Sequence, residues 1–264
     1  MNTKTLSPRA LSIIDQYLHF KAGSAVCSVP YFNNKTVKAR ASLRALIGKG
    51  SPKEISDEVS ALLIKNHVAA DSLADESLKK LLVDSNIGID CSAFAYYILN
   101  AENGELGKGS LDKHIAFVKC TGMVGKIRCA LRPIENCDVA TLADDRNSRA
   151  IPWQEIAPGD LITMIGIADP AVSARAADRD HVLVVHQVEY QNFVPLRIHY
   201  SHAVAYPEDG VYGSGIRQGM IETMAADQPL MGQEWIEAGM RGQQNRIFAT
   251  AQRSETKLKR LNWF

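Results

Sequence analysis

The sequence predicts an α+β fold with an antiparallel sheet, and two observations support this prediction. Helix signals fill the first half of the 264-residue chain, whereas short β-rich runs bounded by turn residues follow one another in the second half. Helices first and consecutive strands later favour helices packed on an antiparallel sheet over alternating strands and helices. No internal repeat and no linker rich in Pro, Gly or Ser divides the chain, so residues 1–264 are expected to form a single domain.

Capping residues and apolar spacing predict the helices. Ser7-Pro8 suits an N-cap followed by a first helical position, and Ser51-Pro52-Lys53-Glu54 has the spacing of a capping box. A further helix is expected over residues 75–83. The run 91–99 is apolar on nearly every side, which is typical of a buried helix, and polar residues 100–109 are expected to end it.

The strands are predicted from β-rich runs at residues 160–165, 181–188 and 196–203. Weaker candidates cover 216–224 and 246–252. A two-residue turn at Gln191-Asn192 is expected to join the second and third runs as a hairpin. Residues 257–264 are expected to form a solvated or packing terminus.

Composition excludes several classes of protein. A net charge of +1 gives no electrostatic footprint for nucleic acid, and no apolar run approaches the roughly 20 residues that span a bilayer. The N-terminal residues lack the pattern of a cleaved export signal, so a cytoplasmic location is expected, with secretion by another route left open. The five cysteines form no CxxC pair and suit no common zinc motif, so free thiols and no metal site are expected.

Cys91 is the candidate nucleophile, because it begins the buried helix. Unpaired N–H groups and the helix dipole at this end would lower the pKa of a thiol and could hold an oxyanion. Asp90 could cap the same helix. On the local sequence alone, a packing cysteine explains the position equally well.

A nucleophilic cysteine needs a base from elsewhere in the chain, and His181 is the candidate because it opens a strand. His186 has the opposite parity and should face the other side of the sheet.

The Gln191-Asn192 turn would place His181 opposite His202, which is therefore preferred as the orienting residue. A shifted register would favour His199, the second choice, or Ser201. The preferred register also pairs Leu183 with Tyr200 and Val185 with Ile198.

Four segments follow one another in chain order and belong together. They are Asp90-Cys91-Ser92-Ala93-Phe94, Pro158-Gly159-Asp160-Leu161-Ile162, His181-Val182 and Tyr200-Ser201-His202-Ala203. In this order they resemble the NlpC/P60 family of papain-like cysteine peptidases, which act on bacterial cell-wall peptides. Residues 246–253 also resemble the closing strand of that family, and the resemblance covers chiefly residues 86–100 and 156–222.

The resemblance implies a papain-like sheet packed on the nucleophile helix, with Cys91 as nucleophile, His181 as base and His202 as orienting residue. It also implies that Tyr31 lies beside the active site, and that Asp90 and Ser92 help to hold the L-Ala–γ-D-Glu part of a substrate. Residues 32–86 and 100–156 are longer than the family pattern requires and are expected to be insertions, the first of them helical.

The expected function is hydrolysis of a γ-D-glutamyl amide bond in a muropeptide or similar peptide, through an acyl-enzyme and without a cofactor. A papain-like acyltransferase or protein-cleaving effector on the same fold is a second possibility. A non-catalytic binding module with a residual triad is a third.

Overall fold

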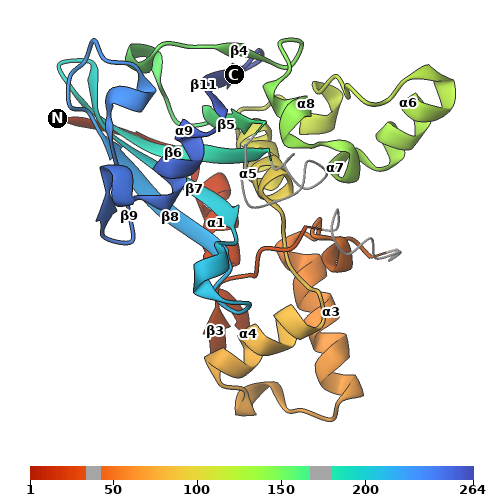
Figure 1. Ribbon diagram of the computed structural model, residues 1–264. Helices are drawn as coiled ribbons and strands as arrows, with labels where there is room; N and C mark the ends of the chain where they lie inside the picture. The colour runs from red at the N-terminus through yellow and green to blue at the C-terminus, as the bar shows by residue number, and fades with distance from the viewer. Residues whose placement is uncertain (34–42, 167–179) are drawn as a thin grey trace.

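The computed structural model describes residues 1–33, 43–166 and 180–264 (Figure 1). It is a mixed α+β structure with one large antiparallel sheet, which confirms the coarse fold class. The described part contains eight α-helices: α1 (Pro8–Leu18), α3 (Pro52–Lys65), α4 (Asp75–Asp84), α5 (Cys91–Glu105), α6 (Gly122–Leu131), α7 (Pro133–Asn136), α8 (Val139–Ala143) and α9 (Arg246–Gln252).

Nine of the described strands form the large sheet, in the order β10-β9-β8-β7-β6-β5-β11-β4, with β1 paired to the end of β6. They are β1 (Asn2–Thr5), β4 (Ser148–Ala150), β5 (Leu161–Ile165), β6 (His181–Gln191), β7 (Val194–Val204), β8 (Gly215–Glu222), β9 (Glu234–Glu237), β10 (Met240–Arg241) and β11 (Glu255–Leu261). Strands β2 (Phe20–Ala22) and β3 (Ala25–Cys27) form a separate hairpin.

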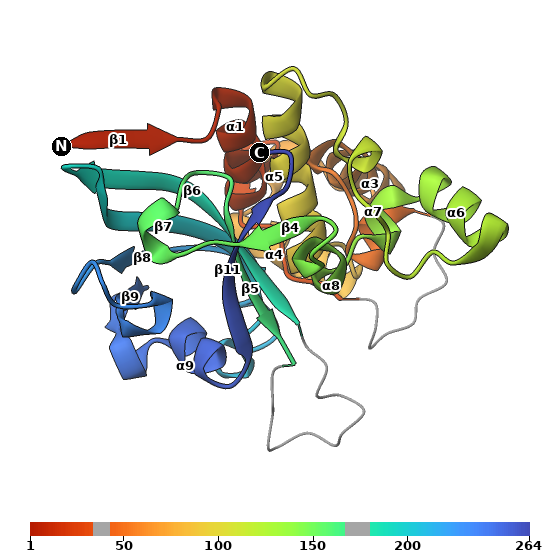
Figure 2. The same ribbon diagram turned by 90° about the horizontal axis from the view of Figure 1, so that it is seen from above.

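The two faces of the sheet are buried in two different cores. Val182 and Val184 of β6 face the core that contains α1 and α5, whereas Leu183 and Val185 face the core that contains α9. Figure 2 shows α1 and α5 on one side of the strands and α9 on the other. Because strand side chains alternate between faces, a single strand can supply residues to both cores.

The predicted helix starts are confirmed. The Ser7 side chain caps α1, and Ser51 with Glu54 forms a complete capping box at the start of α3. Helix α5 continues to Glu105 instead of ending before Asn100. Asn100 and Asn103 lie within the helix, and their side chains bind the segment that follows it: Asn100 accepts from the Leu111 N–H at 2.9 Å and Asn103 donates to the Gly109 carbonyl at 2.8 Å.

Two predictions at the C-terminal end are wrong. Residues 246–252 form helix α9, not a strand, because the Asn245 side chain caps the N–H groups of Ile247 and Phe248. The closing strand is β11 instead, which lies inside the sheet between β5 and β4, so residues 257–264 are not simply a terminus. Arg260 fixes this strand through two hydrogen bonds to Asp160, of 2.7 and 2.8 Å.

The predicted register of the β6–β7 hairpin is also wrong. Tyr200 pairs with Val185 instead of Leu183, and the turn lies at Asn192-Phe193, where both residues have positive φ. This is the geometry of a type I′ turn, which Asn adopts readily at its first central position. Register shifts beside His186 and before Tyr190 also interrupt the hairpin.

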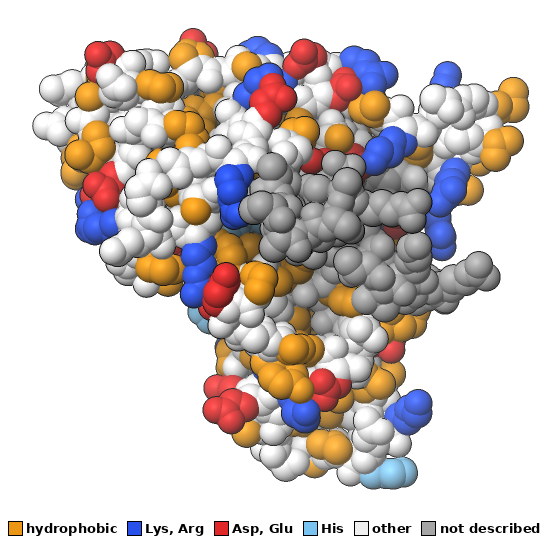
Figure 3. Space-filling view, in the orientation of Figure 1, with side chains coloured by type: hydrophobic (Ala, Val, Ile, Leu, Met, Phe, Trp, Pro, Cys, Tyr) orange, Lys and Arg blue, Asp and Glu red, His pale blue; other side chains and the backbone are white. Residues whose placement is uncertain are grey.

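The expectation of five free thiols is not met either, because Cys120 and Cys129 are paired as a disulfide. The chain folds back at the start of α6, which brings Cys120 beside Cys129 on the helix. Helix α6 exposes an apolar face, seen at the right edge of Figure 3, with Met123, Val124 and Leu131 among the most exposed apolar residues. None of the helices in the described ranges is long and apolar enough to cross a bilayer.

Candidate active site

Three segments that are distant in sequence meet at the start of α5. Ile89 forms isolated β-bridges with both Tyr31 and Lys49. The next residue, Asp90, is the N-cap of α5, and its Oδ1 accepts a hydrogen bond of 2.8 Å from the Ala93 N–H. These contacts fix the position at which Cys91 begins the helix.

The sulfur of Cys91 faces the first residues of β6. The Cys91 thiol donates to the carbonyl oxygen of Asp180, 3.9 Å away, and the backbone N–H of Val182 also points to the sulfur. His181 lies between these two residues in the chain. The structure therefore brings the predicted nucleophile to the strand end that carries the predicted base.

The pKa of Cys91 differs from the sequence prediction. Burial, and next the carboxylate of Asp90, raise this pKa from 9.0 to about 12, although Lys49 and two backbone N–H groups act in the opposite direction. Burial, together with the neighbouring His202, also lowers the pKa of His181 well below its ordinary value. The prediction of a low-pKa thiol is wrong for the resting protein, because removal of the thiolate from water outweighs the helix terminus.

His181 and His202 are in direct contact. His181 Nε2 and His202 Nδ1 are 2.8 Å apart, and both side chains are buried. His199 lies elsewhere, with its Nε2 2.8 Å from Glu189 Oε1, so the predicted preference for His202 as the neighbour of His181 is confirmed. His186 contacts Ser201 instead, with Nδ1 and Oγ 3.0 Å apart.

The contact between His181 and His202 was predicted correctly although the predicted register was wrong, and there is a physical reason for this. The shift that moves Tyr200 from Leu183 to Val185 is two residues long, and a strand repeats its side-chain direction every two residues. The same side chains therefore stay on the same face of the sheet.

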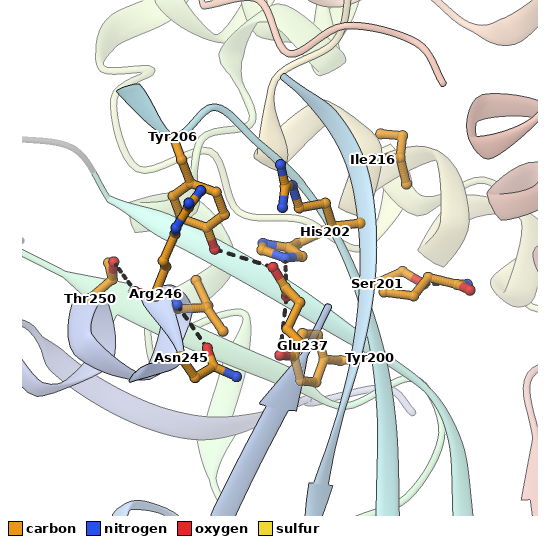
Figure 4. A network of polar contacts seen from close by, with 12 residues as sticks. Tyr200, Ser201, His202, Tyr206, Ile216, Glu237, Asn245, Arg246 and Thr250 are labelled. Carbon is orange, nitrogen blue, oxygen red and sulfur yellow. Dashed lines mark hydrogen bonds and ion pairs between the residues drawn. The ribbon is translucent and has the colours of Figure 1, made fainter. Parts of the chain in front are cut away.

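Glu237, at the end of β9, extends this pair into a chain of three side chains. His202 Nε2 donates to Glu237 Oε2 across 2.9 Å, as Figure 4 shows. Only 3% of the Glu237 surface is exposed. The sequence analysis missed this residue because it did not predict β9, although the apolar pair Trp235-Ile236 before it was a signal for a buried strand.

Lys49 is the second functional candidate that the sequence analysis missed. Its ammonium group is buried and lies 2.8 Å from Asp90 Oδ2 and 2.9 Å from Ser92 Oγ. Burial alone would lower the pKa of Lys49, but the charge of Asp90 outweighs this effect and the pKa is raised. No sequence pattern marks a single lysine between two glycines as buried.

Asp180 lines two cavities. One, of about 370 Å³, is lined by Cys91, Asp90 and Ser92, with Lys49 at its wall. The other, of about 490 Å³, is lined by His181 and Tyr31. The structure therefore places Asp90 and Ser92 on the Cys91 side and Tyr31 on the His181 side, not all three on one wall.

Comparison of the chain with models of protein families, with curated proteins and with solved structures finds no match. Within the described ranges, no group of three or more His, Cys, Asp or Glu side chains is arranged to hold a metal ion.

Proposed function

We propose that the protein is a cysteine hydrolase of the NlpC/P60 type, with Cys91 as nucleophile, His181 as base and His202 as the orienting residue. The single observation that carries this proposal is the position of the Cys91 sulfur at the start of β6, against the backbone on both sides of His181. His181, the residue between these two backbone contacts, belongs to the buried His181–His202 pair.

The neutral forms of Cys91 and His181 define the proposed route. As the sulfur attacks the carbonyl carbon of an amide, the thiol proton passes to His181, which then gives it to the leaving nitrogen. The C–N bond breaks and a thioester remains on Cys91. Water attacks the thioester with loss of a proton to His181, and this proton returns to the sulfur as the acid product leaves.

The first turn of α5 supports the proposed oxyanion site. Helix geometry leaves the N–H groups of Cys91 and Ser92 without carbonyl partners inside the helix, whereas the Asp90 side chain takes that of Ala93. Such donors, aimed at the developing negative charge, contribute a large part of the rate in acyl transfer.

The proposed substrate is a cell-wall-derived peptide with a γ-D-glutamyl amide bond, bound across the two cavities with Tyr31 on one side and Asp90 and Ser92 on the other. The carboxylate of Asp90 already binds Lys49, so a direct bond from Asp90 to a substrate amine would compete with this internal ion pair. In this proposal Asp90 serves the site mainly by capping α5.

The test is incubation with L-Ala–γ-D-Glu–diaminopimelate and with intact sacculi, with products read by mass spectrometry. We expect cleavage after γ-D-Glu by the wild type and none by Cys91→Ala. Cys137→Ala is the matched control, because Cys137 is an equally buried free thiol. If a thioester probe acylates Cys91 while neither substrate is cut, the catalytic assignment stands and the substrate assignment fails. If neither reaction occurs, the proposal fails altogether.

A further inference from the structure

Glu237 is held in one orientation by three side chains. Besides the bond from His202, its Oε2 accepts from the Tyr200 hydroxyl at 3.2 Å and its Oε1 accepts from the Tyr206 hydroxyl at 3.4 Å (Figure 4). Burial acts to raise the pKa of Glu237, but the charge of His202 and the hydrogen bonds from His202 and Tyr200 lower it below its ordinary value. The hydrogen bonds that the two tyrosine hydroxyls donate to Glu237 favour the carboxylate form whether or not His202 is charged.

The absence of a side chain at Gly219 makes room for this arrangement. An ideal Cβ at Gly219 would lie 2.2 Å from the Tyr200 hydroxyl oxygen, which is much closer than atoms can approach. The Tyr200 ring can lie across β8 to reach Glu237 only because the residue there is glycine.

A buried carboxylate fixes where the protons lie on the two histidines. A carboxylate can only accept hydrogen bonds, so His202 Nε2 must carry its proton. In a neutral His202 ring, Nδ1 is then an acceptor, and the 2.8 Å contact requires His181 Nε2 to donate. The lone pair of a neutral His181 ring is consequently on Nδ1, the nitrogen that does not contact His202.

A doubly protonated His202 would place the protons differently, with a chemical consequence for His181. If His202 were an imidazolium, its Nδ1 would donate to His181 Nε2, and the His181 proton would lie on Nδ1. His181 could not then take a proton through Nδ1. The direction of donation along the chain thus decides whether His181 can act as a base towards a thiol.

We propose that Glu237 is a positioning residue that sets the tautomers of His202 and His181 and so presents Nδ1 of His181 as the proton acceptor. The role of Glu237 in catalysis rests on the proposed function, whereas the proton positions on His202 and His181 do not depend on it. Because removal of the acceptor would let both rings adopt the other tautomer, Glu237 acts on the rate of the chemical step and not on substrate binding.

The test is ¹⁵N NMR of the histidine side chains, which distinguishes protonated from unprotonated ring nitrogens, with resonances assigned from His181 and His202 variants. We expect Nε2–H on both rings in the wild type and loss of this pattern for His202 in Glu237→Leu. With the muropeptide substrate, Glu237→Leu should lower kcat about 10²-fold or more and leave KM within about twofold. Glu234→Leu, on the same strand, is the matched control and should change neither measurement.

If Glu237→Leu does not fold, Glu237→Gln tests whether the acceptor at this position sets the tautomers. The amide oxygen can still accept from His202 Nε2, so the tautomers should persist while kcat falls less than in Glu237→Leu. A wild-type spectrum with the His181 proton on Nδ1 would overturn the proposal, as would Glu237→Leu with wild-type tautomers and kcat. Absence of turnover in the wild type would instead count against the proposed function, because the wild-type tautomers are read without substrate.

Discussion

Lys49 and Asp90 form an ion pair beside Cys91, with Nζ 2.8 Å from Oδ2 and both side chains only 11% exposed. The same carboxylate caps α5, so the pair joins the segment around Lys49 to the start of the nucleophile helix. Removal of one partner from such a pair leaves the other charge buried without compensation.

Lys49→Met should therefore lower the free energy of unfolding by about 3–5 kcal/mol, measured by urea denaturation. Lys49→Met combined with Asp90→Asn should recover part of this loss, because it removes the uncompensated charge. Lys53→Met, which removes an exposed ion pair with Asp57 on α3, is the control and should change stability little. A Lys49→Met variant as stable as the control would contradict the role of this pair.

Iodoacetamide should modify Cys27 before Cys91 in the native protein. Cys27 is half-buried, and burial raises its pKa to about 11, whereas the pKa of the buried Cys91 is raised to about 12. Since the thiolate is the reactive form, both exposure and pKa favour Cys27. Peptide mapping after partial alkylation gives the order, and the preference should disappear in urea. Faster modification of native Cys91 would mean that its thiolate is stabilised in the resting protein.

Replacement of the two buried histidines should have unequal effects on activity. His181→Ala should reduce kcat about 10²- to 10⁴-fold, because it removes the proposed base, and His202→Ala should reduce it less. His199→Gln is the control, since His199 contacts Glu189 and not the His181–His202 pair. A His199 variant as impaired as the His202 variant would show that the orienting residue is misassigned.

Acid should destabilise the protein through histidines that are held neutral. Burial, and next His199, lower the pKa of His186 from 6.5 to about 4. The unfolded chain binds this proton first, so the stabilising contribution is complete above pH 6.5 and is lost as the pH falls towards 4. Each such histidine should lower the free energy of unfolding by about 1.4 kcal/mol per pH unit in this range. His186→Gln should therefore lose less stability than the wild type between pH 7 and pH 5, as measured by urea midpoints. Equal losses of stability in the variant and the wild type would refute this prediction.

Local signals in the sequence were sufficient for the helix starts. Ser7, Ser51 and Asp90 act as caps because each side chain bonds to an N–H group three residues further along, and this is a property of the nearby sequence alone. The shared face of His181 and His202 was also predictable, because the observed register of the paired residues Val185 and Tyr200 differs from the predicted one by two residues, which leaves the side-chain directions unchanged.

Contacts between distant segments could not be predicted in this way. The pattern of residues 246–252 suits a short strand or a short helix, and the Asn245 cap decides for the helix. Lys49 and Glu237 are buried only because segments far along the chain supply Asp90 and His202 as partners. The burial of a charged residue cannot be predicted from the sequence until its partner is known.

The place of β11 in the sheet constrains the order in which the protein can fold. Strand β4 pairs with β11 alone among the described strands, and the pairing of β11 with β5 joins residues about ninety positions apart. Contacts of such long sequence separation form late, because a large loop must close first. During synthesis, one edge of β5 therefore cannot pair until residues 255–261 have left the ribosome. Until then β5 presents an unpaired edge, and loss of these residues by proteolysis would free β4 as well and expose that edge to pairing with other chains.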